Sequence, residues 1–406
     1  MVSITDKHDC CGCGACVQAC PVQCISFDAD SEGFRYPQVD TTKCISCGLC
    51  ERVCPESNCA AVVRLPKTYA AYCIDPEVRE ASSSGGIFTI LATYVIDRGG
   101  VVFGARFADD CSVVHDYTEI HEGLSGFRGS KYLQSRVGNS FVKVRDFLKT
   151  GRMVLFSGTP CQIAALRLFL HEDYPNLLLV DFICHGVPSP AVWKLYLESL
   201  MRASCGEGGK NAGSMSLNAF FFRDMSFRDK AFGWKRYGIR LKMSPLVGNQ
   251  NTESSICAER VILQRFTENP YMKAFLSNLS LRPSCYICPA KGFISGSDIT
   301  LGDFWGIDKV DPSIDDDRGV SVMFIHNDDV RKMLQESGVF LKEEPFDKAV
   351  RFNPSVLESV EEPAYRAYFF KHLNRSGGFR KAYKAVFSQS LTKRIARRLW
   401  LQFANK

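Results

Sequence analysis

The sequence CCGCGACVQACP, residues 10–21, decides the fold of the N-terminal part of the chain, and its pattern occurs twice. Residues 44–55 are CISCGLCERVCP, with every cysteine and the proline shifted by 34 positions. Each copy has two residues between its first three cysteines, three residues before the fourth, and a proline directly after it. The repetition indicates an internal duplication. We call residues 10–21 the first run and residues 44–55 the second run.

The spacing has a physical reason. Three thiolates separated by two residues can surround one cube of iron and sulfide, and Gly12, Gly14 and Gly48 let the backbone pass close to it. In bacterial two-cluster ferredoxins the fourth cysteine points away and ligates the other cluster. We therefore predict two 4Fe–4S clusters. The first set of ligands is Cys10, Cys13, Cys16 and Cys54, and the second set is Cys20, Cys44, Cys47 and Cys50.

Zinc is the alternative occupant, because four cysteines in CxxC pairs can bind it, although a zinc ribbon does not need this run twice. Three further cysteines, Cys11, Cys24 and Cys59, lie outside the pattern and are expected to be packed small side chains. Strands are expected at Cys24–Phe27 and Phe34–Val39. A two-cluster ferredoxin-like domain is thus predicted for residues 1–66.

Cysteine usage also bears on the cellular compartment. The chain has 19 cysteines in 406 residues, and residues 1–10 contain no apolar stretch of the kind found in signal peptides. No segment has the 18 or more apolar residues of a membrane span. A cytoplasmic location is expected, in which so many cysteines serve metal binding rather than disulfides.

After residue 66 apolar strand-like and helix-like stretches alternate. Strands are expected at Val101–Phe107, Val154–Phe156 and Leu177–Ile183, and helices at Ile87–Asp97, Cys161–Phe169 and Ala191–Arg202. This order predicts an α/β or α+β body with a partly parallel sheet. A glycine- and serine-rich linker is expected at 204–216. The expected divisions of the body are residues 67–203, residues 204–350 and a basic helical tail at 351–406.

Two kinds of loop in the body could carry chemistry. Residues 82–86, SSSGG, precede the helix expected at Ile87, and such a turn can cradle a phosphate with its backbone N–H groups. The alternative is simple capping of that helix by a serine. Cys161 and Cys184 each follow an expected strand, where α/β sheets place active groups. With the Cys285–Cys288 pair they could ligate a third 4Fe–4S cluster, or Cys161 could instead be a nucleophile.

These motifs together resemble a known family. The segments SSGG, GSKY (129–132), GTPCQ (158–162), CHGVPSP (184–190), the CxxCP of Cys285 and SDITLGDFWG (297–306) occur here in the order found in the beta subunits of coenzyme F-420 hydrogenases and dehydrogenases. That family includes 7-hydroxymethyl chlorophyll a reductase. The resemblance extends over roughly residues 5–330 and implies a flavin-binding body of the beta-subunit type.

The resemblance implies FAD next to an iron–sulfur cluster. Expected flavin contacts are Ser83, Ser84, Gly85, Gly86 and Lys131. The cluster ligands implied, here called the third set, are Cys161, Cys184, Cys285 and Cys288. His185 is a candidate proton donor near the flavin, with a packed or hydrogen-bonded loop histidine as the alternative.

We therefore expect an iron–sulfur flavoenzyme, an oxidoreductase that connects ferredoxin-type one-electron carriers with hydride chemistry at the flavin. The alternative is an electron-transfer subunit without a substrate site of its own, and a zinc-bearing scaffold is a third possibility. The expected partners are a ferredoxin or another redox protein and a small molecule that the sequence does not identify.

The charge is uneven along the chain. Residues 364–406 hold eleven Lys or Arg and no Asp or Glu, so the net charge of +6 becomes −5 for residues 1–363. This distribution does not predict a nucleic-acid partner. Apolar residues recur every fourth position from Tyr383 to Phe403 and predict an amphipathic helix. It would either contact the inner membrane surface or an acidic partner, or pack on the body with a solvated basic face.

Overall fold

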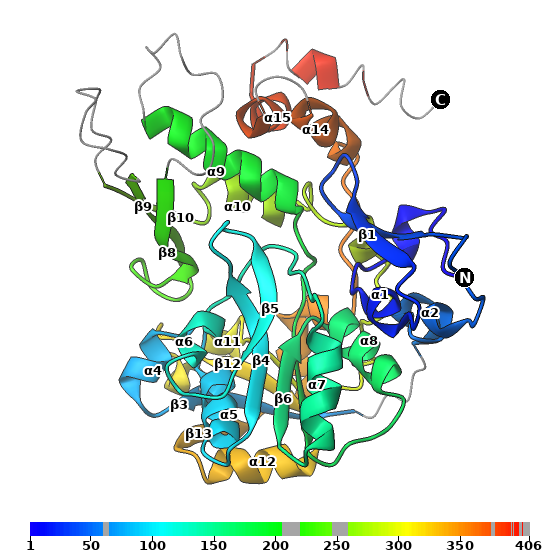
Figure 1. Ribbon diagram of the computed structural model, residues 1–406. Helices are drawn as coiled ribbons and strands as arrows, with labels where there is room; N and C mark the ends of the chain where they lie inside the picture. The colour runs from blue at the N-terminus through cyan, green and yellow to red at the C-terminus, as the bar shows by residue number, and fades with distance from the viewer. Residues whose placement is uncertain are drawn as a thin grey trace, which may run out of the picture.

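A computed structural model describes residues 1–59, 65–204, 220–245, 259–374, 378–390, 392, 394–397 and 400. Apart from Ser204, the linker expected at 204–216 lies outside these residues. Figure 1 shows the N-terminal module, residues 1–59, at one side of a large sheet, with a layer of helices above both.

The N-terminal module contains the two expected strands. Strand β1 (Ile25–Ala29) pairs antiparallel with β2 (Arg35–Val39). The helices α1 (Ala15–Ala19) and α2 (Leu49–Arg52) occupy equivalent places in the two runs, and each begins after a glycine with φ of 73°. Helix α3 (Pro55–Asn58) follows Cys54 and starts at Pro55. The duplication in sequence is therefore a duplication in local structure.

The body is built on an eight-stranded mixed sheet of order β13-β3-β12-β11-β7-β6-β4-β5. Its centre is parallel and consists of β4 (Val101–Phe107), β6 (Val154–Gly158), β7 (Leu177–Phe182) and β11 (Ile299–Asp303). The outer strands β3 (Lys67–Cys73), β5 (Val113–Thr118), β12 (Ser321–Ile325) and β13 (Val339–Glu343) are antiparallel to their neighbours. The mixed α/β fold class expected from the sequence is confirmed.

Helices of the body follow the predicted alternation. The expected helices are α5 (Ile87–Ile96), α8 (Pro160–Leu170) and α9 (Pro190–Ser204), whereas α7 (Ser140–Lys149) was not expected. The main sheet takes strands from both sides of the boundary expected at residue 203, because β11, β12 and β13 come from the later segment. A separate antiparallel sheet of β8 (Phe220–Asp229), β9 (Gly238–Pro245) and β10 (Arg260–Arg265) was not expected.

The N-terminal module packs tightly on the body. Cys11, Cys13 and Ala15 share a buried core with residues of β4, β6 and α8. The Gln18 side-chain oxygen accepts the backbone N–H of Phe141, at the start of α7, at 2.9 Å. At the other end of the module, the largely buried Arg366 side chain forms an ion pair with Glu32 at 2.5 Å. These contacts fix how the cysteine runs face the sheet.

The C-terminal helices α14 (Arg366–Leu373) and α15 (Gly378–Phe387) cover the upper side of the molecule (Figure 1). Phe379, Ala382 and Ala385 of α15 are buried. Phe379 and Ala382 share a core with residues of α9. Residues 378–387 thus follow the packed alternative for the tail. Most of residues 391–403 lie outside the described ones, and membrane contact there stays a prediction. No helix in the described residues is long and apolar enough to cross a bilayer.

Candidate metal centres and cofactor site

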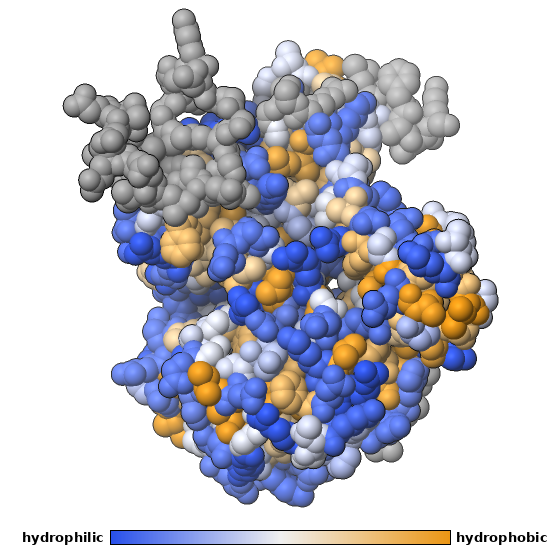
Figure 2. Space-filling model, viewed as in Figure 1, coloured by the Kyte–Doolittle hydropathy of each residue, from blue (hydrophilic) through white to orange (hydrophobic). Residues whose placement is uncertain are grey.

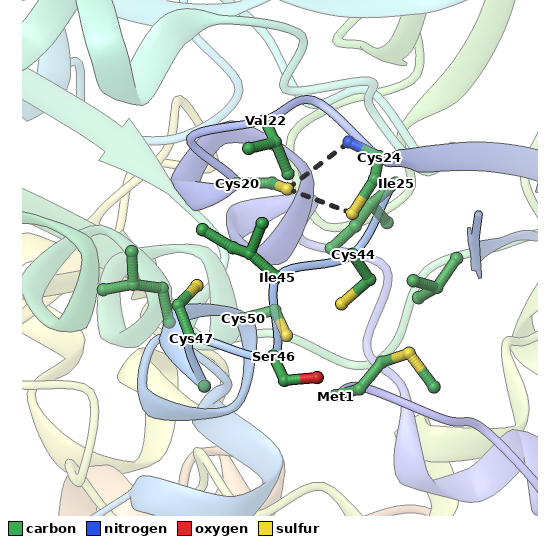
Figure 3. A pocket seen from close by; sticks show the side chains of 13 residues that line it. Met1, Cys20, Val22, Cys24, Ile25, Cys44, Ile45, Ser46, Cys47 and Cys50 are labelled. Atoms are coloured by element: carbon green, nitrogen blue, oxygen red, sulfur yellow. Dashed lines mark hydrogen bonds between the residues drawn. The ribbon is translucent and has the colours of Figure 1, made fainter. Parts of the chain in front are cut away.

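The second set surrounds a cavity at the surface of the N-terminal module. Figure 3 shows cysteine side chains from both runs around this small cavity. Cys24 also lines it, and its Sγ lies 3.5 Å from that of Cys20. Cys47 is exposed. The lining cysteines are Cys20, Cys24, Cys44, Cys47 and Cys50, which include all four members of the second set.

The first set lies deeper, on the side of the body. Burial, followed by the charges of Cys10 and Cys54, raises the pKa of Cys16 to about 12. The neighbouring Cys11 lowers the pKa of Cys13, but burial and the charges of Cys16 and Cys10 outweigh it, so that this pKa is raised. Burial also raises the pKa of Cys54, and the charge of Cys10 raises it further. Four thiols that oppose one another's ionisation fit a site in which metal replaces their protons.

The third set gathers at the carboxyl edge of the parallel strands. Cys161 is in the first turn of α8, directly after β6, and Cys184 follows the neighbouring β7. Burial raises the pKa of Cys184 to about 11, and Cys161 raises it further against the effect of Lys291. Cys285 is in the short helix η3 (Pro283–Ile287) and Cys288 follows it. Burial raises the pKa of both thiols, and the charges of Cys161 and Cys184 raise it further.

Cys11 joins the first set to the third set. Its thiol packs in one core with Cys13 and Cys161 and lies close enough to shift the pKa of both. Cys11 was expected to be a packed small residue, and it is indeed only 8% exposed. Its position between two ligand sets could not be inferred from the spacing, because that position depends on how the module docks on α8.

Within the described ranges, no three of these side chains already stand in metal-ligating geometry. The ligand assignments therefore stay predictions. What the residues provide is the chemistry that suits 4Fe–4S clusters, since each set brings four thiols to one place, which is largely buried for the first and third sets. For the second set that place is the cavity of Figure 3.

The SSGG loop has a different role from helix capping by serine. Gly86 occupies the N-cap position of α5 with φ of 89°, and no side chain caps the helix. Ser84 donates to the carbonyl of Val320 at 3.0 Å, and Ser83 Oγ accepts the N–H of Ser130 at 2.7 Å. A Cβ on Gly85 would lie 2.4 Å from the carbonyl oxygen of Ala71, so this position requires glycine. The loop is thereby held against β3 and the GSKY segment.

A cavity of about 800 Å³ opens beside this loop. Its size is within the range of cofactor sites. Both expected flavin segments contribute, through Ser83 and Gly129, while Gly85 and Gly86 are buried behind them. Four basic residues also line it, namely Arg228, Lys230, Arg240 and Arg318, together with three acidic ones, Glu77, Glu80 and Asp229. The basic members of this lining suit the phosphates of a dinucleotide cofactor, so the residues present fit the expected FAD.

Two of these basic side chains are held in place. Arg228, with 3% of its side chain exposed, pairs with Asp303 at 2.8 Å and lies over the Tyr237 ring at 3.9 Å. Lys230 donates to the carbonyl oxygens of Arg79 at 2.6 Å and Arg318 at 2.7 Å, and burial lowers its pKa to about 8. No sequence motif marks Arg228 or Lys230, so the sequence did not predict that they belong to this site.

The hydrogen-bond partners of Lys131 and His185 are not among the residues that line the cavity. The amine of Lys131 donates to the carbonyl oxygens of Gly126 and Arg128 at 2.9 and 2.8 Å, and burial lowers its pKa to about 7. The ring of His185 hydrogen-bonds to the side chain of Asn278 at 2.7 Å, and burial lowers its pKa. The geometry of His185 matches a hydrogen-bonded loop histidine, and its role as proton donor stays a prediction.

Comparison with family models supports the two iron–sulfur runs of the N-terminal module. Residues 9–58 match the model of the 4Fe-4S dicluster domain. With the two runs and their buried thiols, this match identifies the chain as an iron–sulfur protein of electron transfer. Residues 151–215, which carry Cys161 and Cys184, match the model of the C-terminal region of the coenzyme F420 hydrogenase/dehydrogenase beta subunit. The resemblance expected from the sequence is confirmed over these two segments.

Solved structures give a weaker likeness. A chain of the F420-reducing [NiFe] hydrogenase complex from Methanosarcina barkeri has 16% sequence identity and a TM-score of 0.45, with 79% of this chain and 97% of that chain covered. No curated protein sequence matches the chain.

Proposed function

We propose that the chain is an iron–sulfur flavoprotein oxidoreductase that passes electrons between a one-electron carrier protein and a two-electron reaction at a flavin. The observation that carries the proposal is the packing of Cys11 and Cys161 in one core. It joins the ferredoxin-like module to the third set of thiols in the body. A ferredoxin-like domain with no role in the body would not need this contact.

The three sets form a sequence from the surface inward. The second set lies around the outer cavity, and Cys50 is among the thiols that raise the pKa of Cys16 in the first set. The first set reaches the third set through Cys11. Neighbouring sets thus lie near one another, as a relay for single electrons requires.

The last step of the path leads to the cavity beside the SSGG loop. Strands β7 and β11 are parallel neighbours, and the N–H of Ile183 donates to the carbonyl of Leu301 at 2.8 Å. This register brings Asp303, at the end of β11, next to Cys184. Asp303 in turn pairs with Arg228, which lines the cavity. The third set and the cavity therefore share one edge of the sheet, where α/β folds bind their ligands.

A bound flavin would exchange two electrons with a small molecule and single electrons with a nearby cluster. In this chain, Arg228, Lys230 and Arg318 would hold its phosphates, and Ser83 would hold the loop at the cavity wall. The substrate would enter the same cavity, and a redox protein would dock at the second run.

The second run offers a suitable surface for such a partner. Figure 2 shows apolar surface on the right-hand rim, over α2 and the adjoining loops of the N-terminal module. Met1, Val22 and Ile45 are 46%, 38% and 61% exposed. An apolar patch around an exposed ligand loop is what a transient electron-transfer contact uses.

The test begins with anaerobic purification and analysis of iron, acid-labile sulfide, zinc and flavin. We expect about twelve iron and twelve sulfide per chain, from three 4Fe–4S clusters, and one flavin. Zinc without labile sulfide would refute the proposal. Full iron and sulfide without flavin would favour an electron-transfer subunit that has no substrate site of its own.

A pair of variants tests the position of the flavin. Ala81 is exposed and lines the cavity, so Ala81→Trp should fill it and reduce flavin content without removing a hydrogen bond. Lys149, at the end of α7, lies towards the opposite edge of the sheet, and Lys149→Trp should keep the flavin. Equal flavin content in both variants would contradict the proposed cavity.

A further inference from the structure

Arg282 is a charged side chain of the body that reaches the first cysteine run. It is 0% exposed. Its backbone carbonyl accepts the N–H of Cys285, so it belongs to the loop of the third set. Its guanidinium, however, reaches the first set. One residue thus connects the ligand loops of two sets.

The three oxygen atoms that accept hydrogen bonds from the guanidinium group carry no formal charge. It donates to the carbonyl oxygens of Cys10 at 2.5 Å and Arg35 at 2.8 Å, and to the side-chain oxygen of Gln134 at 3.1 Å. A fourth contact goes to the Sγ of Cys10 at 3.4 Å. The Tyr36 ring lies 4.4 Å from the cation. Glu56 is within electrostatic range but is not one of its hydrogen-bond partners.

A buried cation whose acceptors are uncharged is costly unless an anion lies nearby. A 4Fe–4S cluster with four thiolate ligands is a net anion, and it gains one more negative charge on reduction. A fixed cation that hydrogen-bonds to a ligand sulfur therefore stabilises the reduced form more than the oxidised form. The effect is large because the site excludes water.

The duplication provides an internal comparison. Gly12 of the first run corresponds to Ser46 of the second run, and both have positive φ, 73° and 53°. A Cβ on Gly12 would lie 2.6 Å from Nη1 of Arg282, so only a glycine leaves room for the guanidinium. The second run keeps a side chain at this position and faces the surface cavity instead.

We propose that Arg282 raises the reduction potential of the cluster at Cys10, Cys13, Cys16 and Cys54 above that of the cluster at the second set. Electrons that enter at the exposed second run then move downhill to the first set and toward the body. Arg282 is a positioning residue that acts on the cluster through Cys10. This inference rests on the proposed function, since it requires both clusters of the module.

The experiment is an anaerobic redox titration of the full chain, followed by electron paramagnetic resonance, after iron and sulfide have been counted. In Arg282→Gln one cluster component should shift to more negative potential, and the others should stay. At the wild-type midpoint of that component, we expect its reduced-to-oxidised ratio to fall at least tenfold, which equals about 59 mV for one electron. Arg282→Lys keeps the charge without the planar fork and should give an intermediate shift.

Gly12→Ser and Ser46→Gly exchange the residues of the two runs. Gly12→Ser should displace the guanidinium and shift the same component in the same direction, and the loop should tolerate it because Ser46 occupies the equivalent place. Ser46→Gly is the matched change in the second run and should leave the potential of the first-set cluster unchanged. If Arg282→Gln does not retain its clusters, Gly12→Ser decides the question.

The outcomes separate the two proposals. Variants with full iron and sulfide content and wild-type potentials would overturn the role of Arg282 while leaving the proposed function intact. A wild-type chain without labile sulfide would refute the proposed function itself. A merely structural role for Arg282 would change thermal stability without moving one cluster potential alone.

Discussion

The two cysteine runs have the same spacing and opposite surroundings. Positions 11 and 45 correspond under the 34-residue shift, yet Cys11 is 8% exposed and contacts Cys161, while Ile45 is 61% exposed. Positions 22 and 56 also correspond. Val22 is 38% exposed, whereas burial raises the pKa of Glu56 to about 7.

This difference shows how one sequence pattern can provide two distinct electron sites. The repeated cysteines fix the type of cofactor, because they set the number and spacing of thiolates. The residues between them fix the surroundings, because they either pack against the body or meet solvent. The first run faces inward and the second run outward, and each prediction below changes one side of this contrast.

Removal of a ligand should have the largest effect. Cys13 and Cys47 are equivalent in the two runs, and Cys13→Ala or Cys47→Ala should each lose one cluster, about four iron and four sulfide. We expect dithionite to reduce the flavin through the inner cluster of Cys47→Ala. In Cys13→Ala the relay is broken inside, so the flavin should be reduced far more slowly. Anaerobic stopped-flow measurement of flavin absorbance tests this, and equal rates in both variants would contradict the inward order of the clusters.

The second-largest expected effect is on stability, which should depend more on the buried side of the N-terminal module than on its exposed side. Phe34 is fully buried in a core shared with Trp193 and Tyr271 of the body, and Phe34→Ala should cost about 3–5 kcal/mol. Ile45→Ala, on the open face, should stay within about 0.5 kcal/mol of the original chain. Anaerobic denaturant unfolding measures both. Similar losses for the two variants would mean that the second run is also covered by protein.

The contrast also explains what the sequence could predict. The runs, the strands β1 and β2, and the alternation from α5 to α9 follow from local spacing and periodicity, and the structure contains them. The edge position of Cys161 and Cys184 follows from the strands before them. These signals are local, so a single sequence carries them.

Other features depend on contacts between distant segments. The position of Cys11 against Cys161, and that of Arg282 against Cys10, arises only when the module docks on the body. The basic lining of the cavity comes from β8, β9 and the loop before β12, none of which carries a recognisable motif. Arg282 had one available signal, its place three residues before Cys285, but nothing in the sequence indicated that it would reach Cys10.

Acid should lower the stability of the core that holds Cys11 and Cys13. His115 stacks on Phe156, in the core that holds Cys11 and Cys13, and its ring hydrogen-bonds to the carbonyl of Ser157 at 3.1 Å. Burial lowers the pKa of His115 to about 4, whereas the unfolded chain titrates near 6.5. The unfolded state therefore binds more protons between these values. Its contribution to stability is present above pH 6.5 and is lost as the pH falls toward 4.

A decrease from pH 6.5 to 5.5 should cost about 1 kcal/mol of the free energy of unfolding. His115→Gln should show a flatter dependence, because glutamine does not titrate. Anaerobic denaturant unfolding at the two pH values measures the slope. The idea fails if wild type and variant lose stability equally.

The smallest expected effect concerns the outward face. Ile45→Lys places a charge in the apolar patch without removing a cysteine, and it should slow reduction by a bacterial two-cluster ferredoxin roughly threefold to tenfold, since such changes act on association. Reduction by dithionite should keep its rate, because a small reductant needs no docking surface. Ile74 is 65% exposed and lies outside the N-terminal module, so Ile74→Lys is the matched control. If both lysine variants slow the ferredoxin equally, the effect is one of overall charge and the second run is not where the partner docks.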